Sequence, residues 1–230
     1  MIFDQYSSVR IINLPHRRDR RREMDRELAK VHLLGDPKVQ YFSAVKPSES
    51  GLFHCVGANG AFHSHLQVLK QALAARQSVI VLEDDCQFLD AASTVEQDSD
   101  TDVLYGGYAV ASDEGDLLNA DIEGAHFMGF SLAALEKLVP FLRSLLNPDT
   151  VFDPSIVRSE FNPRIRPPID GAYVWFRRYH PKFKTQFLPL ASYRISATDI
   201  GERKWFDQLP ILRSVANGAR RVKEKVQFGA

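Results

Sequence analysis

Short β-branched runs alternate along the chain with longer stretches in which apolar residues have helical spacing. The first run, Val9–Leu14, precedes a stretch in which Met24, Leu28 and Val31 recur at the spacing of one helix face. The same patterns predict further strands at Val39–Val45, Ser78–Leu82, Val103–Tyr105, His126–Phe130 and Phe183–Leu190, and helices at Asp19–Leu34, Gly60–Ala75, Leu132–Leu146, Asp170–Tyr179 and Pro210–Val226. This order is typical of α/β proteins with a mostly parallel sheet flanked by helices, which bind ligands at the carboxyl ends of the strands.

A proline-rich segment interrupts the alternation between residues 147 and 168. Its prolines break every candidate helix or strand, so we expect a long surface loop there. Loops of this length in a compact domain usually carry function, and this one is placed to form a wall or a lid over the ligand crevice.

Charge, cysteine content and hydropathy each exclude a class of protein. The chain carries 29 basic and 29 acidic residues, and this net charge of zero argues against a dedicated nucleic-acid binder. Cys55 and Cys86 are too few for a disulfide framework or a zinc knuckle. The segment Met1–Leu14 lacks the pattern of a secretory signal, and no apolar run approaches the roughly 20 residues of a membrane span. We therefore expect a cytoplasmic protein.

Three carboxylates follow the most apolar of the predicted strands. The run Val79–Leu82 leads directly into Glu83, Asp84 and Asp85. If the strand geometry continues, Glu83 and Asp85 point to one side and Asp84 to the other. Carboxylates in this position suit Mn²⁺ or Mg²⁺, which take their remaining ligands from water and from substrate phosphates. The alternative interpretation is a solvated acidic turn at the end of a buried strand.

Arginines follow the first predicted strand, after Asn13 and Leu14. Arg17 and Arg20 stand at the start of the predicted helix, where they could clamp a diphosphate together with the partial positive charge of the helix N-terminus. The arginines further along alternate with acidic residues, which is typical of a solvated, salt-bridged helix face. We therefore assign anion binding only to the residues nearest to the strand end.

A third motif combines two glycines with a serine and a histidine. Gly57 and Gly60 lead into a predicted helix and would permit a close approach of the backbone to a ligand, to which Ser64 and His65 could form hydrogen bonds. The sequence contains no phosphate loop of the nucleoside triphosphatases, no Gly-x-Ser-x-Gly nucleophile elbow and no dinucleotide fingerprint. The chemistry therefore depends on these three motifs.

In order and spacing, the three motifs resemble those of glycosyltransferase family 25, the lipooligosaccharide-type galactosyltransferases that share a domain with the collagen galactosyltransferases. The resemblance is carried by Ile12-Asn13-Leu14 with Arg17 and Asp19-Arg20, by Gly57, Gly60 and Ser64-His65, and by Leu82-Glu83-Asp84-Asp85. It extends more weakly through Tyr105-Gly106-Gly107-Tyr108, His126–Ser131, Asp170-Gly171 and Thr198-Asp199-Ile200, which together cover about the first 200 residues. Where the family commonly has His-Gln before Ser-Asp-Ile, this chain has Ala191-Ser192-Tyr193 before Thr198-Asp199-Ile200.

The resemblance implies a GT-A type fold, a nucleotide-sugar donor and inverting transfer to a hydroxyl group, usually with a divalent metal. The expected donor is a UDP-hexose, with galactose as the sugar, and the expected acceptor is a glycan or glycolipid such as the lipooligosaccharide core. We expect Asp85 to hold the metal ion, with Glu83 as a second ligand. The residues expected to bind the nucleotide sugar are Asn13, Leu14, Arg17, Arg20, Gly57, Gly60, Ser64, His65, Glu83, Asp84, Gly106 and Gly107.

Inverting transfer also requires a general base close to the acceptor hydroxyl, and Asp170 is the candidate. Because Asp170 precedes a predicted helix, an N-cap explains its position almost equally well. Gly106 and Gly107 follow a strand end and could form either the floor of the sugar pocket or a tight turn. His126 heads an apolar run and is expected to be a buried core histidine.

We expect residues 1–203 to form one glycosyltransferase-like domain and residues 204–230 a basic amphipathic helix. That helix either packs on the domain or contacts acidic lipid at a membrane surface. Two other functions stay open at this point. A metal-dependent phosphohydrolase could use the same acidic strand end to activate water, and a non-catalytic module could bind a nucleotide sugar without transferring it.

Overall fold

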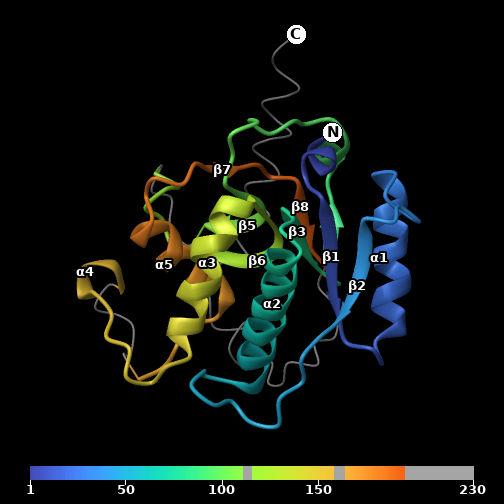
Figure 1. The fold of residues 1–230 in the computed structure, drawn as a ribbon. Coiled ribbons are helices and arrows are strands. Elements are labelled where there is room, and N and C mark those ends of the chain that lie inside the picture. The colour runs from blue at the N-terminus through green and yellow to red at the C-terminus, as the bar shows by residue number, and fades with distance from the viewer. Residues whose placement is uncertain (111–115, 158–163, 195–230) are drawn as a thin grey trace. The chain divides into compact units, whose positions relative to one another are not determined.

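The computed structural model describes residues 1–110, 116–157 and 164–194 and contains a six-stranded central sheet (Figure 1). The strand order across this sheet is β2-β1-β3-β6-β5-β7. In that order the strands are Val39–Ser43, Ser8–Asn13, Val79–Glu83, Ile122–Phe130, Val103–Val110 and Thr185–Phe187. A separate two-stranded sheet pairs β4 (Cys86–Phe88) with β8 (Ala191–Tyr193).

Strand β6 runs against the direction shared by the other strands of the central sheet. The neighbours β2, β1 and β3 are parallel, β6 is antiparallel to both β3 and β5, and β7 is parallel to β5. The connection between Val110 and Ile122 is too short for the crossover helix that a parallel neighbour would need. The prediction of a mostly parallel sheet flanked by helices is confirmed, and the reversed strand is an addition to it.

Helices cover both faces of the sheet, and each face has its own hydrophobic core (Figure 1). The α-helices are α1 (Arg18–Lys30), α2 (Val56–Ala74), α3 (Leu132–Leu145), α4 (Pro154–Val157) and α5 (Ile169–Tyr179), and short 3₁₀ helices span Ile2–Gln5 and Asp90–Ser93. Val79 and Val81 of β3 pack into the core formed with α2, α3 and α5. Ile80 and Leu82 pack into the core formed with α1. This alternation explains why β3 is apolar from Val79 to Leu82.

The pairing of β1 with β3 brings two of the sequence motifs to one edge of the sheet. Ile12 lies beside Glu83 in this parallel register. Asn13, which ends β1, therefore emerges next to the acidic residues that follow Glu83. This is the carboxyl edge at which the α/β pattern predicts ligand binding.

Helix α2 begins earlier than the sequence pattern predicts, at Val56 and not at Gly60. Cys55 is its N-cap, and its Sγ atom accepts a hydrogen bond from the Ala58 N–H over 3.4 Å. Gly57 and Gly60 therefore lie within the helix rather than in a loop before it. A cysteine is an unusual N-cap residue, which is why the start of this helix was predicted too late.

The second half of the chain departs from the predicted pattern at several points. The loop predicted between residues 147 and 168 contains the single-turn helix α4. The strand predicted at Phe183–Leu190 is reduced to β7, and the three-residue strands β4 and β8 are too short for periodicity to reveal. The domain boundary at residue 203, Thr198-Asp199-Ile200 and the helix Pro210–Val226 lie outside the described residues. Within the described ranges, none of the helices is both long enough and apolar enough to span a membrane.

Candidate functional site

Asp84 joins the end of β3 to β1 and α1 through two charge-assisted hydrogen bonds. Asn13 donates from Nδ2 to Asp84 Oδ2 over 2.7 Å, and Arg20 donates from Nη1 to Asp84 Oδ1 over 2.8 Å. Asp84 is only 7% exposed, so both bonds are largely shielded from water. Arg20, which the sequence places in a diphosphate clamp, thus holds the acidic turn in this structure.

Glu83 ends β3 and contacts α2. Its Oε1 atom lies 3.1 Å from Nε2 of His65, and Nδ1 of the same ring lies 3.0 Å from the hydroxyl of Tyr173 in α5. Burial acts to raise the pKa of Glu83, but the hydrogen bond from His65, with a smaller contribution from the charge of Arg20, brings that pKa below its usual value. Glu83 is therefore ionised at neutral pH.

Asp85 lies in the turn after β3 and has a carboxylate oxygen without a hydrogen-bond partner. Its Oδ1 atom is buried and makes no hydrogen bond within the described ranges, and its Oδ2 atom lies 4.0 Å from Nη1 of Arg20. Burial and the charge of Glu83 raise the pKa of Asp85 to about 7, against the opposing charge of Arg20. Leaving a buried carboxylate oxygen unbonded is unfavourable, and a hard divalent cation is a suitable partner for it.

The acidic turn offers two carboxylates to a metal ion. Strand β3 ends at Glu83, so Asp84 and Asp85 are not part of its alternation. Asp84 bonds to Arg20 of α1, whereas the charge of Glu83 acts on Asp85. In the part of the chain that the structure describes, no three His, Cys, Asp or Glu side chains are gathered closely enough to hold a metal. Mg²⁺ and Mn²⁺ fit two carboxylates when phosphate oxygens and water complete the shell.

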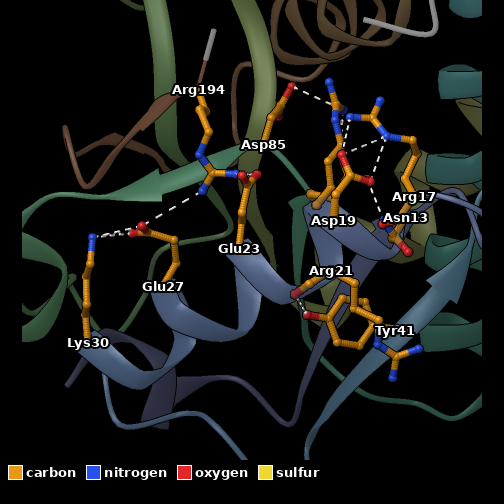
Figure 2. Close-up of polar contacts among 12 residues, drawn as sticks. Asn13, Arg17, Asp19, Arg21, Glu23, Glu27, Lys30, Tyr41, Asp85 and Arg194 are labelled. Carbon is orange, nitrogen blue, oxygen red and sulfur yellow. Dashed lines mark hydrogen bonds and ion pairs between the residues drawn. The ribbon is translucent and has the colours of Figure 1, made fainter. Parts of the chain in front are cut away.

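Arg17 forms a two-point contact with an acidic residue of its own turn (Figure 2). Its Nε and Nη2 atoms donate to the carboxylate of Asp19 over 3.0 and 2.7 Å, and these bonds lower the pKa of Asp19. The Arg17 N–H donates to the carbonyl of Leu14 over 2.8 Å, and the Arg17 carbonyl accepts Nδ2 of Asn13 over 3.3 Å. To bind a diphosphate, the Arg17 guanidinium would have to replace its hydrogen bonds to Asp19 with hydrogen bonds to phosphate oxygens.

Gly60 and Ser64 hold α2 against the segment that follows β2. The hydroxyl of Ser64 donates to the Gly60 carbonyl over 2.6 Å and accepts the Val45 N–H over 2.8 Å. A Cβ atom on Gly60 would lie 2.8 Å from the Val45 carbonyl oxygen and 3.2 Å from Cδ of Pro47. These two residues of the motif therefore have a packing role, whereas His65 reaches the acidic turn.

Gly106 and Gly107 lie within β5 and make room for side chains of β6. A Cβ atom on Gly106 would lie 2.7 Å from the ring of Phe127, and one on Gly107 would lie 2.2 Å from Nε2 of His126. His126 is 4% exposed, and burial lowers its pKa, so the expectation of a buried core histidine is confirmed. The tight turn considered for the two glycines is absent from this described strand, and their role in sugar binding stays a prediction.

Asp170 lies in the first turn of α5 and bonds to β6. Its Oδ2 atom accepts the N–H of Gly124 over 2.9 Å, and its Oδ1 atom accepts the N–H of Gly171 over 2.9 Å. The N-cap position belongs to Pro168, so the N-cap interpretation of Asp170 is wrong. Burial raises the pKa of Asp170, the two N–H donors oppose this rise, and the charge of Glu83 adds to it. The charges of Asp170 and Glu83 therefore act on each other.

Arg194, which no sequence motif identifies, anchors the acidic turn from β8. Its N–H donates to the carbonyl of Asp85 over 2.8 Å. Its guanidinium pairs with Glu23 and lies 3.9 Å from Oε1 of Glu27, both on α1 (Figure 2). Ala191–Tyr193, where the sequence differs from the family 25 motif, forms β8, and Arg194 follows this strand directly. A lone arginine after a three-residue strand gives no signal that sequence reasoning could use.

The structure brings together only part of the predicted site. The predicted residues gathered at the carboxyl edge of the sheet, or acting on it electrostatically, are Asn13, Arg20, His65, Glu83, Asp84, Asp85 and Asp170. Arg17 and Leu14 lie beside this group. Gly57 lies in the first turn of α2, whereas Gly60, Ser64, Gly106 and Gly107 pack helices and strands. A hollow of about 400 Å³ beside α4 and the end of α5 is lined by none of the predicted site residues.

Comparison with known proteins identifies no family for this chain. No protein-family model matches the sequence, and no curated protein matches it either. Among solved structures, the chain is similar to a glycosyltransferase involved in the glycosylation of the major capsid of PBCV-1. The two share 13% identity and a TM-score of 0.43, over 83% of this chain and 95% of that one. The resemblance to family 25 therefore stays a prediction, and the function has to be derived from the site.

Proposed function

We propose that this chain is a glycosyltransferase that moves a hexose, in the first instance galactose, from UDP-hexose to a hydroxyl of a glycan such as the lipooligosaccharide core. The observation that carries the proposal is Asp85, whose buried oxygen accepts no hydrogen bond from the described residues and whose pKa is raised by the charge of Glu83 at the carboxyl edge of the sheet. The motif resemblance to glycosyltransferase family 25 supports the same function. A mostly parallel sheet with helices on both faces supports a GT-A type fold.

Asp85 and Glu83 are the residues that would hold Mn²⁺ or Mg²⁺. Bound there, the ion would act as a Lewis acid that stabilises the negative charge of the departing diphosphate. Asp84 keeps these two carboxylates in place through Asn13 and Arg20. Arg17, whose carbonyl accepts a hydrogen bond from the same Asn13, would supply a second cation. The positive charges of the two arginines favour a bound diphosphate in the same place.

Asp170 is the group that would accept the proton of the acceptor hydroxyl. In the transfer, the acceptor oxygen forms a bond to the anomeric carbon, the bond from that carbon to the diphosphate breaks, and the hydroxyl proton passes to the Asp170 carboxylate. A raised pKa makes the ionised carboxylate a stronger base, and two backbone N–H donors fix its orientation. Attack from the side opposite the leaving group inverts the configuration of the sugar.

The acceptor and the place of action complete the proposal. We place the enzyme in the cytoplasm, where nucleotide sugars are available, and give it no nucleic-acid partner because its net charge is zero. A glycolipid acceptor would bring it to a membrane surface. The basic segment 204–230 is the candidate for that contact.

A binding screen with a matched pair of variants tests the proposal. The melting temperature is measured with UDP-, GDP- and CMP-sugars, each with and without Mn²⁺, for the wild type, Asp85→Asn and Asp90→Asn. Asp90 is exposed and lies five residues further along, so Asp90→Asn should respond like the wild type. We expect a Mn²⁺-dependent shift with one UDP-hexose that Asp85→Asn loses. No shift with any sugar nucleotide would contradict the proposal.

Product analysis then separates transfer from the two other functions. Incubation with the donor found in the screen and an oligosaccharide acceptor should give a lengthened glycan and free UDP in equal amounts. Release of phosphate or sugar phosphate without a lengthened glycan would indicate a phosphohydrolase. Binding without any product, together with unchanged behaviour of Asp85→Asn, would indicate a non-catalytic module.

A further inference from the structure

A chain of hydrogen bonds leads from α5 through α2 to the acidic end of β3. The Tyr173 hydroxyl lies 3.0 Å from Nδ1 of His65, and Nε2 of His65 lies 3.1 Å from Oε1 of Glu83. His65 is fully buried and Tyr173 is 1% exposed, whereas the Glu83 side chain is 31% exposed. These hydrogen bonds thus begin in the core at Tyr173 and end at the partly exposed Glu83.

The donor and acceptor roles along this chain follow from the partners present. An ionised carboxylate can only accept, so the hydrogen between His65 and Glu83 belongs to Nε2 of His65. Within the described contacts, Nδ1 of His65 is the one acceptor available to the buried Tyr173 hydroxyl. Tyr173 therefore donates to Nδ1, and this bond selects the tautomer that places a hydrogen on Nε2.

The same bonds fix the Glu83 carboxylate. His65 engages Oε1, and Oε2 accepts no hydrogen bond from the described residues. A buried imidazole that is held at both nitrogens cannot rotate without breaking one of its bonds. The orientation of the carboxylate is therefore set from within the core, on the side away from the solvent.

We propose that Tyr173 is a positioning residue that acts through His65 to hold Glu83 ready to bind the divalent metal beside Asp85. The inference rests on the proposed function, because it assigns Tyr173 a part in the metal site of that function. Groups that orient a metal ligand from behind commonly change metal affinity by roughly 10- to 100-fold when they are removed. A phenol with only a packing role would affect stability and leave metal binding unchanged.

The test compares two buried tyrosines that lose only their hydroxyl groups. Mn²⁺ binding in the presence of saturating UDP is measured by water-proton relaxation for the wild type, Tyr173→Phe and Tyr105→Phe. Tyr105 is fully buried, and its hydroxyl lies near Arg177 and makes no described hydrogen bond to His65, Glu83 or Asp85, so it is the matched control. We expect Tyr173→Phe to weaken Mn²⁺ binding roughly 10-fold or more and Tyr105→Phe to change it less than about twofold.

A double-variant cycle asks whether Tyr173 acts through Glu83. In the Glu83→Gln background, Tyr173→Phe should weaken Mn²⁺ binding by less than about twofold, because the carboxylate that Tyr173 positions is already gone. An equal loss in both backgrounds would overturn the inference. So would Mn²⁺ binding by Tyr173→Phe that equals the wild type.

Two substitutions of His65 keep the inference testable if Tyr173→Phe does not fold. Gln can place an amide donor near the position of Nε2, whereas Asn reaches only about as far as Nδ1. We expect His65→Gln to retain more Mn²⁺ binding than His65→Asn, and the opposite order would overturn the inference. If the wild type binds no Mn²⁺ with or without UDP, the proposed function itself fails and the inference fails with it. Wild-type binding together with an unaffected Tyr173→Phe overturns the inference alone.

Discussion

Asp84 and Asp85 are adjacent in one turn, yet their surroundings are opposite in character. Asp84 faces β1 and α1, from which Asn13 and Arg20 bond to its two carboxylate oxygens. Asp85 experiences the like charge of Glu83, and its pKa is raised to about 7. One of its oxygens is buried and accepts no hydrogen bond from the residues that the structure describes. The first carboxylate fastens the turn to the fold. The second carries an electrostatic conflict that a bound cation would relieve, which is the usual mark of a functional residue.

Asp170, the proposed general base, lies outside this turn, and its substitution should have the largest effect on turnover. We expect Asp170→Asn to lower the turnover number about 1000-fold, equivalent to about 4 kcal/mol, because the general base is lost. Binding of Mn²⁺ and UDP should change less than about threefold, because Asn keeps an oxygen for the Gly124 N–H. Wild-type turnover should rise with pH as Asp170 ionises, over a range shifted upward by its raised pKa. Turnover that is unaffected by the substitution would remove Asp170 from the mechanism.

Substitution of Asp84 should produce the largest loss of stability. The Arg20 side chain is 13% exposed, and Asp84→Asn removes its 2.8 Å ion pair while the Asp85 carboxylate stays 4.0 Å away. Breaking a buried ion pair by removing one partner typically lowers the free energy of unfolding by about 3–5 kcal/mol. Urea unfolding at pH 7 measures the loss, and Asp90→Asn is the control. A loss below about 1 kcal/mol would mean that Asp84 does not hold the turn.

Asp85→Asn should have the opposite effect on stability. Because the folded pKa of about 7 lies above the unfolded value, the stabilising contribution of Asp85 is complete below the unfolded pKa and is lost as the pH rises through 7. An amide does not ionise, so at pH 8 and without metal the variant should be roughly 2–4 kcal/mol more stable than the wild type. The gain should disappear near pH 4. If the free energies of unfolding of the two proteins changed with pH in parallel, the pKa of Asp85 would not be raised in the folded protein.

The same comparison shows what the sequence could and could not predict. The apolar run Val79–Leu82 indicated both the buried strand and the edge where its carboxylates lie, because local hydrophobicity determines strand position. It could not reveal that Asp84 pairs with Arg20, since that bond depends on how α1 packs. Gly107 illustrates the same limit. The position of Gly107 after a predicted strand suggested a sugar pocket or a turn. The structure shows that the His126 ring occupies the space where a Cβ of Gly107 would lie.

Short or irregular elements were the other limit. Strand β8 and Arg194 hold the acidic turn by its backbone, but a three-residue strand has too few positions to show alternation. The sequence motif placed His65 in the predicted site, and the structure shows that its ring contacts Glu83. Its partner Tyr173 was not predicted, because its contact joins residues 108 positions apart in the chain. Tertiary packing, and not local pattern, brings them together.

The smallest effect concerns the exposed side of the site, where Arg17 binds Asp19. We expect Asp19→Asn to strengthen UDP binding about two- to threefold, because the Asp19 carboxylate no longer competes with phosphate for Nε and Nη2 of Arg17. Calorimetry at about 50 mM and about 300 mM salt measures the gain, which should shrink as salt screens the contact. The double variant Arg17→Gln/Asp19→Asn should not show the gain, because the guanidinium that would bind phosphate is gone. Tighter binding that persists in the double variant would show that Arg17 is not a diphosphate contact.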